Sequence, residues 1–129
     1  MKIEREILFG GYNYKGHWVE GFACRDGDNG ELLIIGPYMS EDTDAWSVNH
    51  VYQYTGINFD GKRIFEGCRI VGGYQWMEKD GIAMSREIDD TVVWRRGGWV
   101  LESTDENLFE LMDNDSLYWD ASVIPPRNY

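Results

Sequence analysis

The chain has 129 residues, of which 43% are hydrophobic, a composition that fits one globular domain and argues against a disordered chain. The formal net charge of −11 disfavours bulk nucleic-acid binding, because a field of that sign repels phosphate backbones, while a basic protein partner remains compatible. The two cysteines show no C-x-x-C spacing, which disfavours a zinc site, and we expect both thiols to stay free in a reducing cytoplasm.

Nothing in the sequence indicates secretion or membrane insertion. The first six residues are charged and lack the apolar core of a signal peptide. No apolar run approaches the ~20 residues that are needed to span a membrane. Aromatic residues are frequent, and 15 glycines against three prolines suit many tight turns. This combination favours an all-β fold.

The first fifty residues are predicted to form a β-meander. Residues 3–9 are compatible with a strand that ends at the glycine pair 10–11, and residues 17–24 predict a second strand. After a loop at 25–30, residues 31–35 predict a short apolar strand, and residues 40–44 an acidic loop. Asp26 and Asp28 are spaced as in a calcium loop, but the EF-hand pattern requires Glu where Pro37 stands. A hairpin turn is therefore favoured over a metal site.

Residues 51–71 predict a hairpin followed by a corner. Residues 51–55 are rich in β-branched and aromatic side chains, and Asp60-Gly61 is a strong signal for a tight turn. A short apolar run then breaks at Glu66-Gly67 before another strand begins. We predict a mainly β fold in one domain over residues 1–129. It consists of a small SH3-like or similar bent β-barrel at about 51–124, preceded by the β-meander at about 1–50.

The rest of the chain predicts hairpins and one helix. The pairs Gly72-Gly73 and Asp89-Asp90 are expected to be turns, and further hairpin turns are expected at residues 79–81 and 95–98. Ser103 and Glu106 have the spacing of a capping box. Apolar residues at 108, 111 and 112 then predict one short helix near residues 104–112. Late strand pieces are expected at 117–119 and 122–124.

One ordered set of residues carries a resemblance: Gln53-Tyr54-Thr55-Gly56, Gly61-Lys62, Ile64-Phe65-Glu66-Gly67 and Ile70-Val71. In order and spacing this set resembles the signature of the YopX family of phage and prophage proteins, Q-Y/F-T-G-L, a polar loop with N-G, and I-Y/F-E-G-D-I-V. Residues 5–10 and 16–21 are similar to the usual opening of that family. Cys68 stands where the family has Asp, and Pro125-Pro126 replace the glycine and strand of its usual ending. The family has no established biochemical activity, so the resemblance implies a fold class and a phage or prophage setting.

The first candidate binding site is the tip of a predicted hairpin. Trp94 and Trp99 flank the turn, with Arg95 and Arg96 between them. Aromatic side chains beside arginine are typical of single-strand nucleic-acid binders and of protein hot spots. The alternative is a cross-strand aromatic pair that stabilises the hairpin and fills a small core.

Glu66 is the second candidate, because it lies in the family motif at a chain corner. Its carboxylate could contact a polar ligand or act as an acid. The structural alternative, which we favour, is that it accepts backbone N–H groups where the strand ladder is interrupted. If the Glu and Asp of the family formed an acid/base or metal pair, Cys68 would leave that pair incomplete here.

The sequence contains no recognisable enzyme motif. There is no H-E-x-x-H, no G-x-S-x-G and no phosphate-binding glycine loop, and the only histidines are His17 and His50. We therefore expect no catalytic residue, metal or cofactor. The expected function is a non-enzymatic phage or prophage accessory protein that binds a macromolecule, above all a host or phage protein, for which a basic surface is compatible with the charge. The alternatives are a nucleic-acid-binding small β-barrel, which the net charge opposes, and an enzyme without a known motif; homo-oligomers remain compatible.

Overall fold

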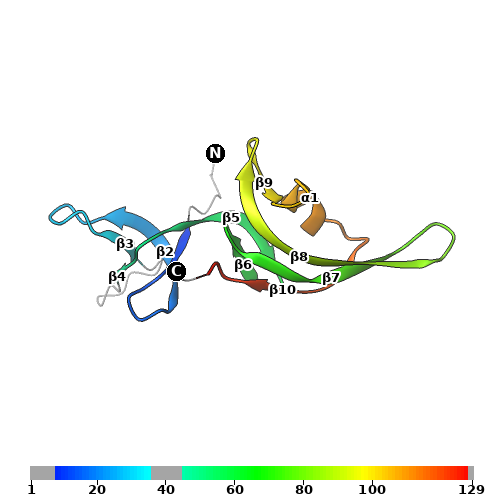
Figure 1. The fold of residues 1–129 in the computed structure, drawn as a ribbon, viewed down its shortest axis with the longest axis horizontal. Coiled ribbons are helices and arrows are strands. Elements are labelled where there is room, and N and C mark those ends of the chain that lie inside the picture. The colour runs from blue at the N-terminus through cyan, green and yellow to red at the C-terminus, as the bar shows by residue number, and fades with distance from the viewer. Residues whose placement is uncertain (1–7, 36–44, 128–129) are drawn as a thin grey trace, which may run out of the picture. The chain divides into compact units, whose positions relative to one another are not determined.

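The computed structural model describes residues 8–35 and 45–127, and it confirms a mainly β fold with antiparallel strands (Figure 1). Predictions for residues 3–7 and 40–44 lie outside the described residues. The strands are β1 (Phe9–Tyr12), β2 (Trp18–Arg25), β3 (Leu32–Ile35), β4 (Ala45–Ser47), β5 (Tyr52–Phe59), β6 (Lys62–Phe65), β7 (Arg69–Met77), β8 (Ala83–Arg95), β9 (Gly98–Leu101) and β10 (Tyr118–Ile124). The one helix among these residues is α1 (Leu108–Met112).

The chain divides into two compact units. The first comprises residues 1–56 with 127–129, and the second comprises residues 57–126. The boundary falls within β5, six residues after the end of the predicted meander at about residue 50. That the two parts make one domain stays a prediction.

The first unit holds the predicted meander. Its strands follow the hydrogen-bonding order β4-β3-β2-β1-β5. The pair Gly10-Gly11 lies inside β1, so the prediction that it ends a strand is wrong. A Cβ on Gly10 would come within 2.1 Å of the Trp18 ring, so glycine is needed there to let that ring lie against β1. The side chain of Ile34 is fully buried in the core of this unit.

The second unit begins with the predicted hairpin and corner. β5 and β6 are neighbours joined by the turn at Asp60-Gly61, where both residues have positive φ. At the corner after β6, Gly67 has a φ of 84° and donates its N–H to the carbonyl of Val92 at 2.7 Å. A four-stranded sheet follows in the order β10-β7-β8-β9. The predicted sequence of strand, turn, short strand, kink and strand is confirmed.

Two predicted turns are wrong. β7 runs without a break through Gly72-Gly73, and β8 runs through Asp89-Asp90, so each strand is longer than its local sequence indicates. The two late strand pieces likewise form the single strand β10. In the described residues β9 and β10 remain the two edges of an open sheet, so the predicted small bent β-barrel is not closed.

The short helix lies slightly later than predicted. Its N-cap is Asn107, whose side chain accepts the N–H of Glu110, and the Ser103–Glu106 capping box does not form. Leu108 is fully buried, so the helix packs through the first position of the predicted apolar stripe. In the described part of the chain, no helix is both long and apolar enough to cross a membrane.

Candidate binding surfaces

The β8–β9 hairpin brings the two predicted tryptophans together. Trp94 and Trp99 are cross-strand partners whose rings meet edge to face, with centroids 4.9 Å apart. The Trp94 side chain is 52% exposed, whereas Trp99 is half-buried. The pair therefore stabilises the hairpin and also presents an aromatic surface, so the two interpretations of the sequence are compatible at this site.

The two arginines of this hairpin differ in their contacts. The Arg95 guanidinium donates to the carbonyl of Glu102 at 2.9 Å and pairs with the Asp105 carboxylate at 3.0 Å. It therefore holds the segment after β9. Arg96 occupies the turn with a φ of 51°, is exposed, and makes no hydrogen bond or ion pair with the described residues. Of the two, Arg96 is the cation available to a ligand.

Glu66 lies at the corner between β6 and β7, as predicted, and is half-buried. Backbone groups make two hydrogen bonds at this corner: Gly67 donates to Val92, and Cys68 donates to Phe65 at 3.1 Å. The Cys68 Sγ in turn accepts the N–H of Phe65 at 3.4 Å. The Glu66 carboxylate accepts no hydrogen bond from the described residues, so the capping role that we favoured from the sequence is absent. The structure does not bring Glu66 together with the candidates on the β8–β9 hairpin.

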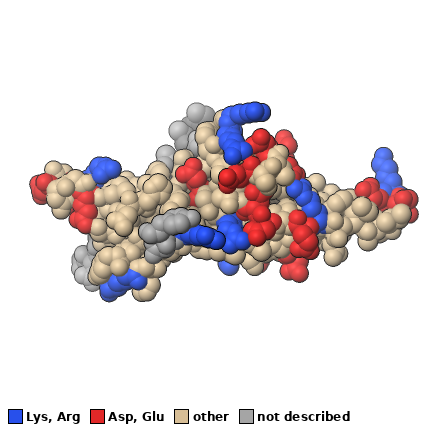
Figure 2. All heavy atoms as spheres, in the orientation of Figure 1, with Lys and Arg blue, Asp and Glu red and all other residues tan. Residues whose placement is uncertain are grey.

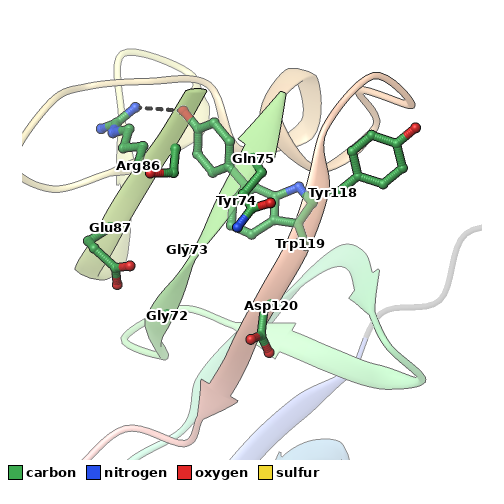
Figure 3. A pocket seen from close by; sticks show the side chains of 10 residues that line it. Gly72, Gly73, Tyr74, Gln75, Arg86, Glu87, Tyr118, Trp119 and Asp120 are labelled. Atoms are coloured by element: carbon green, nitrogen blue, oxygen red, sulfur yellow. Dashed lines mark hydrogen bonds between the residues drawn. The ribbon is translucent and has the colours of Figure 1, made fainter. Parts of the chain in front are cut away.

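Sequence reasoning missed a hollow of about 400 Å³ on the four-stranded sheet (Figure 3). Its lining includes Gly72 and Gly73, which bring no side chain to fill the space. In the strand register Gly73 lies between Asp120 of β10 and Glu87 of β8, so two carboxylates flank it. The other lining residues are Tyr74, Gln75, Ser85, Arg86, Tyr118 and Trp119. The hollow suits a polar or cationic group, and it contains no histidine, cysteine or lysine.

Two of the lining residues, Tyr74 and Arg86, also belong to a polar cluster. The Arg86 guanidinium pairs with the Glu106 carboxylate through two hydrogen bonds of 2.6 and 2.9 Å, and it donates to the Tyr74 hydroxyl at 3.0 Å. These bonds from Arg86 hold the pKa of the Glu106 carboxyl below its usual value, and the bond with Glu106 raises the pKa of Arg86. Both groups therefore stay charged near neutral pH, and the cluster joins β8 to the segment that precedes α1.

The β7–β8 hairpin continues beyond the sheet as a two-stranded arm, here defined as residues 76–84 (Figure 1). Three apolar side chains are exposed on it: Met77 at 59%, Ile82 at 57% and Met84 at 40%. The Trp76 indole N–H is held by Glu78 at 3.1 Å. The sequence predicted the turn of this hairpin but not the exposure of its side chains, because exposure depends on where β10 stops pairing with β7.

No arrangement for metal binding appears in the described ranges. No three side chains of His, Cys, Asp or Glu lie close enough together there to hold a metal ion. Cys24 is exposed and Cys68 is buried, and the two form no disulfide. Searches among models of protein families, curated proteins and solved structures found no match to this chain.

Proposed function

We propose that this chain is a non-enzymatic accessory protein of a phage or prophage that acts in the bacterial cytoplasm by binding another protein. The observation that carries this proposal is the exposure of large apolar side chains on two hairpins of the second unit, at Trp94 and on the arm. Exposed apolar and aromatic groups at protruding positions are typical of protein-binding surfaces.

Charge supports a basic partner. The chain carries a net charge of −11, and Figure 2 shows acidic side chains gathered over the second unit on the face drawn. Attraction between surfaces of opposite charge speeds the encounter of two proteins, whereas desolvated aromatic anchors chiefly slow their dissociation. The two contributions can therefore be separated by kinetics.

The proposed setting rests on the resemblance to the YopX family. Two glycines of that motif, Gly56 and Gly67, each have a φ of 84°, a conformation that side chains with a Cβ disfavour. This backbone requirement gives a structural reason for glycine at these two positions of the motif. A shared motif of this kind supports a relationship in fold, and it does not name a reaction or a partner.

The test is capture of a partner from a bacterial host lysate, followed by binding kinetics with the purified partner. We expect rising salt to lower the association rate far more than it changes dissociation. We expect Trp94→Ala to raise the dissociation rate by about tenfold or more, as for a hot-spot aromatic residue. Tyr14→Ala, which removes an exposed aromatic residue of the first unit, is the matched control and should change neither rate.

Circular dichroism melting of Trp94→Ala must show that the fold is retained. Failure to capture any partner, or kinetics that respond neither to salt nor to Trp94→Ala, would count against the proposal. A second candidate, binding of single-stranded nucleic acid, is favoured only by Arg96 beside Trp94 at the hairpin tip. Fluorescence titration with a single-stranded oligonucleotide tests it, and the net charge leads us to expect no binding at physiological salt.

A further inference from the structure

We infer that the outer edge of β8 binds an extended, basic segment of a partner protein as an additional β-strand. This inference rests on the proposed function and specifies the mode of binding. An extended segment that pairs with an open sheet edge gains affinity from main-chain hydrogen bonds and specificity from alternate side chains.

The first step is the direction of the backbone groups of β8. In an antiparallel pair, residues alternate between those bonded to the neighbouring strand and those directed away from it. Glu78 donates to Ile82, and Val92 donates to Cys68, which fixes this alternation along the β7–β8 pair. The even-numbered residues of β8, such as Arg86, therefore bond to β7. The N–H and C=O groups of Ser85, Glu87 and Asp89 point outward.

The second step is that this outward side is open. β9 covers the outer edge of β8 only from Val92 to Arg95, and the carbonyl of Thr91 accepts the N–H of Glu102. Farther toward the arm, the backbone groups of residues 85, 87 and 89 bond to nothing in the described part of the chain. The side chains at these three positions are exposed. About five residues of strand edge are thus available for pairing.

The third step is the chemistry of the occupant. Glu87 faces solvent beside the open edge and makes no ion pair with the described residues, whereas the Asp89 carboxylate is already held by Arg69 at 2.7 Å. A residue opposite Glu87 on an added strand would have its Cβ about 5 Å away, so Lys or Arg fits best there. Met84 lies on the other face and favours an apolar neighbour. The expected segment alternates basic and apolar residues.

The same acidic edge disfavours a second copy of the chain. Two β8 edges in antiparallel pairing would bring Glu87 close to Glu87 or Ser85 of the other copy, between molecules that each carry a net charge of −11. Charged side chains on an edge strand are a recognised means of preventing self-association. Here they exclude an acidic strand while leaving the edge open to a basic one.

The test uses the full chain and two synthetic peptides, one alternating lysine with valine and one alternating glutamate with valine. Amide hydrogen exchange is followed by NMR at Ser85, Glu87 and Asp89. At saturation with the lysine peptide we expect exchange at these amides to slow by about tenfold or more, as for newly formed hydrogen bonds. The glutamate peptide should have no effect. The Arg86 amide, already bonded to β7, is the internal reference.

Ser85→Pro provides the matched variant. It removes an N–H that the fold does not use, and proline is tolerated where the N–H of an edge strand faces solvent. We expect the melting temperature to be kept and the lysine peptide to bind about tenfold more weakly or worse, while Ser85→Ala, which keeps the N–H, binds as the wild type does. If Ser85→Pro unfolds, the exchange pattern of the wild type still decides the question.

Three results would overturn the inference: no binding of the lysine peptide, binding without protection at the three amides, or protection that rises with protein concentration in the absence of peptide. The last would show that a second copy occupies the edge. Equal capture of a natural partner by wild type and by Ser85→Pro would refute binding at the β8 edge, but it would remain consistent with the proposed function. Protection of the three amides by the lysine peptide, without capture of any partner, would support binding at the edge and count against the proposed function.

Discussion

At the scale of single residues, Gly72 and Gly73 show how absent side chains shape a surface. A Cβ on Gly72 would come within 2.3 Å of the carbonyl oxygen of Asp120, and one on Gly73 within 2.5 Å of the carbonyl oxygen of Arg86. Both contacts are with backbone, which cannot move aside without breaking the strand ladder. The two glycines therefore let β10 and β8 lie against β7, and they leave the hollow open.

Gly72→Ala should be strongly destabilising. The residue has a φ of 140° as well as the close backbone contacts, so strain and overpacking add to about 2–4 kcal/mol of lost unfolding free energy. Urea denaturation followed by circular dichroism measures this loss. Gly98→Ala is the control, because a Cβ there meets nothing within 4 Å, and it should cost less than about 1 kcal/mol. Equal midpoints for the two variants would contradict the account.

Glu106 makes stability depend on pH. Its pKa is lowered in the folded state, chiefly by the hydrogen bonds from Arg86, so its contribution is present above the unfolded pKa of about 4.3 and is lost as pH falls through the lower folded pKa. We expect Glu106→Gln to cost about 1 kcal/mol at pH 7, because the pair is partly exposed. The difference should shrink toward zero near pH 2, provided that the chain is still folded there. A difference that stays constant with pH would exclude this origin.

At the scale of elements, local turn chemistry predicted the hairpins well. The turns at Asp60-Gly61 and Arg96-Gly97 each combine two residues of positive φ, a requirement that a glycine in the sequence reveals. Strand ends were predicted less well. Gly72-Gly73 and Asp89-Asp90 are typical turn pairs, but pairing with both neighbours holds the first in β7, and pairing with β7 holds the second in β8.

The candidate surfaces also differ in whether local sequence predicts them. The partnership of Trp94 with Trp99 follows from turn length alone, and it was predicted. The hollow, the arm and the open edge of β8 depend on which distant strands pair and where the pairing stops, since β10 joins β7 from more than forty residues away. No local pattern contains that information, so these surfaces were found only in the structure.

The corner after β6 gives a prediction at this scale. Gly67→Val would force a β-branched side chain into a φ of 84°, at a residue whose N–H also bonds to Val92. We expect a loss of about 1–3 kcal/mol in the free energy of unfolding. Glu66→Ala, at the adjacent position without hydrogen bonds to its carboxylate, should change stability little. A denaturation midpoint that is the same for Gly67→Val and wild type would show that the corner tolerates a side chain.

At the scale of the whole molecule, each unit has its own buried apolar residues and its own cysteine. Ile34 and Val48 are buried in the first unit, and Ile70 and Leu101 in the second. Cys24 belongs to the first unit and is exposed, whereas Cys68 of the second unit is buried. The accessibility of the Cys68 thiol therefore reports on the opening of the second unit alone.

Labelling with a maleimide should distinguish the two thiols in native buffer. We expect Cys24 to react within the time of mixing by hand and Cys68 to react only as fast as the second unit opens. Peptide mass spectrometry assigns the modified residue. In rising urea, labelling of Cys68 should follow the unfolding transition measured by circular dichroism. Rapid labelling of Cys68 without denaturant would show that its environment is open in solution.

The pairing of β10 with β7 also sets an order of events during synthesis on the ribosome. β7 and β8 are adjacent in the chain and can form their hairpin early, but the strand that covers the other edge of β7 is made only later. Until residues 118–124 leave the exit tunnel, the edge of β7 that β10 will cover is open, and Tyr74 lacks the Trp119 ring that packs 4.7 Å from it. The interval before that strand arrives is the time when the chain is most exposed to aggregation and to binding by chaperones.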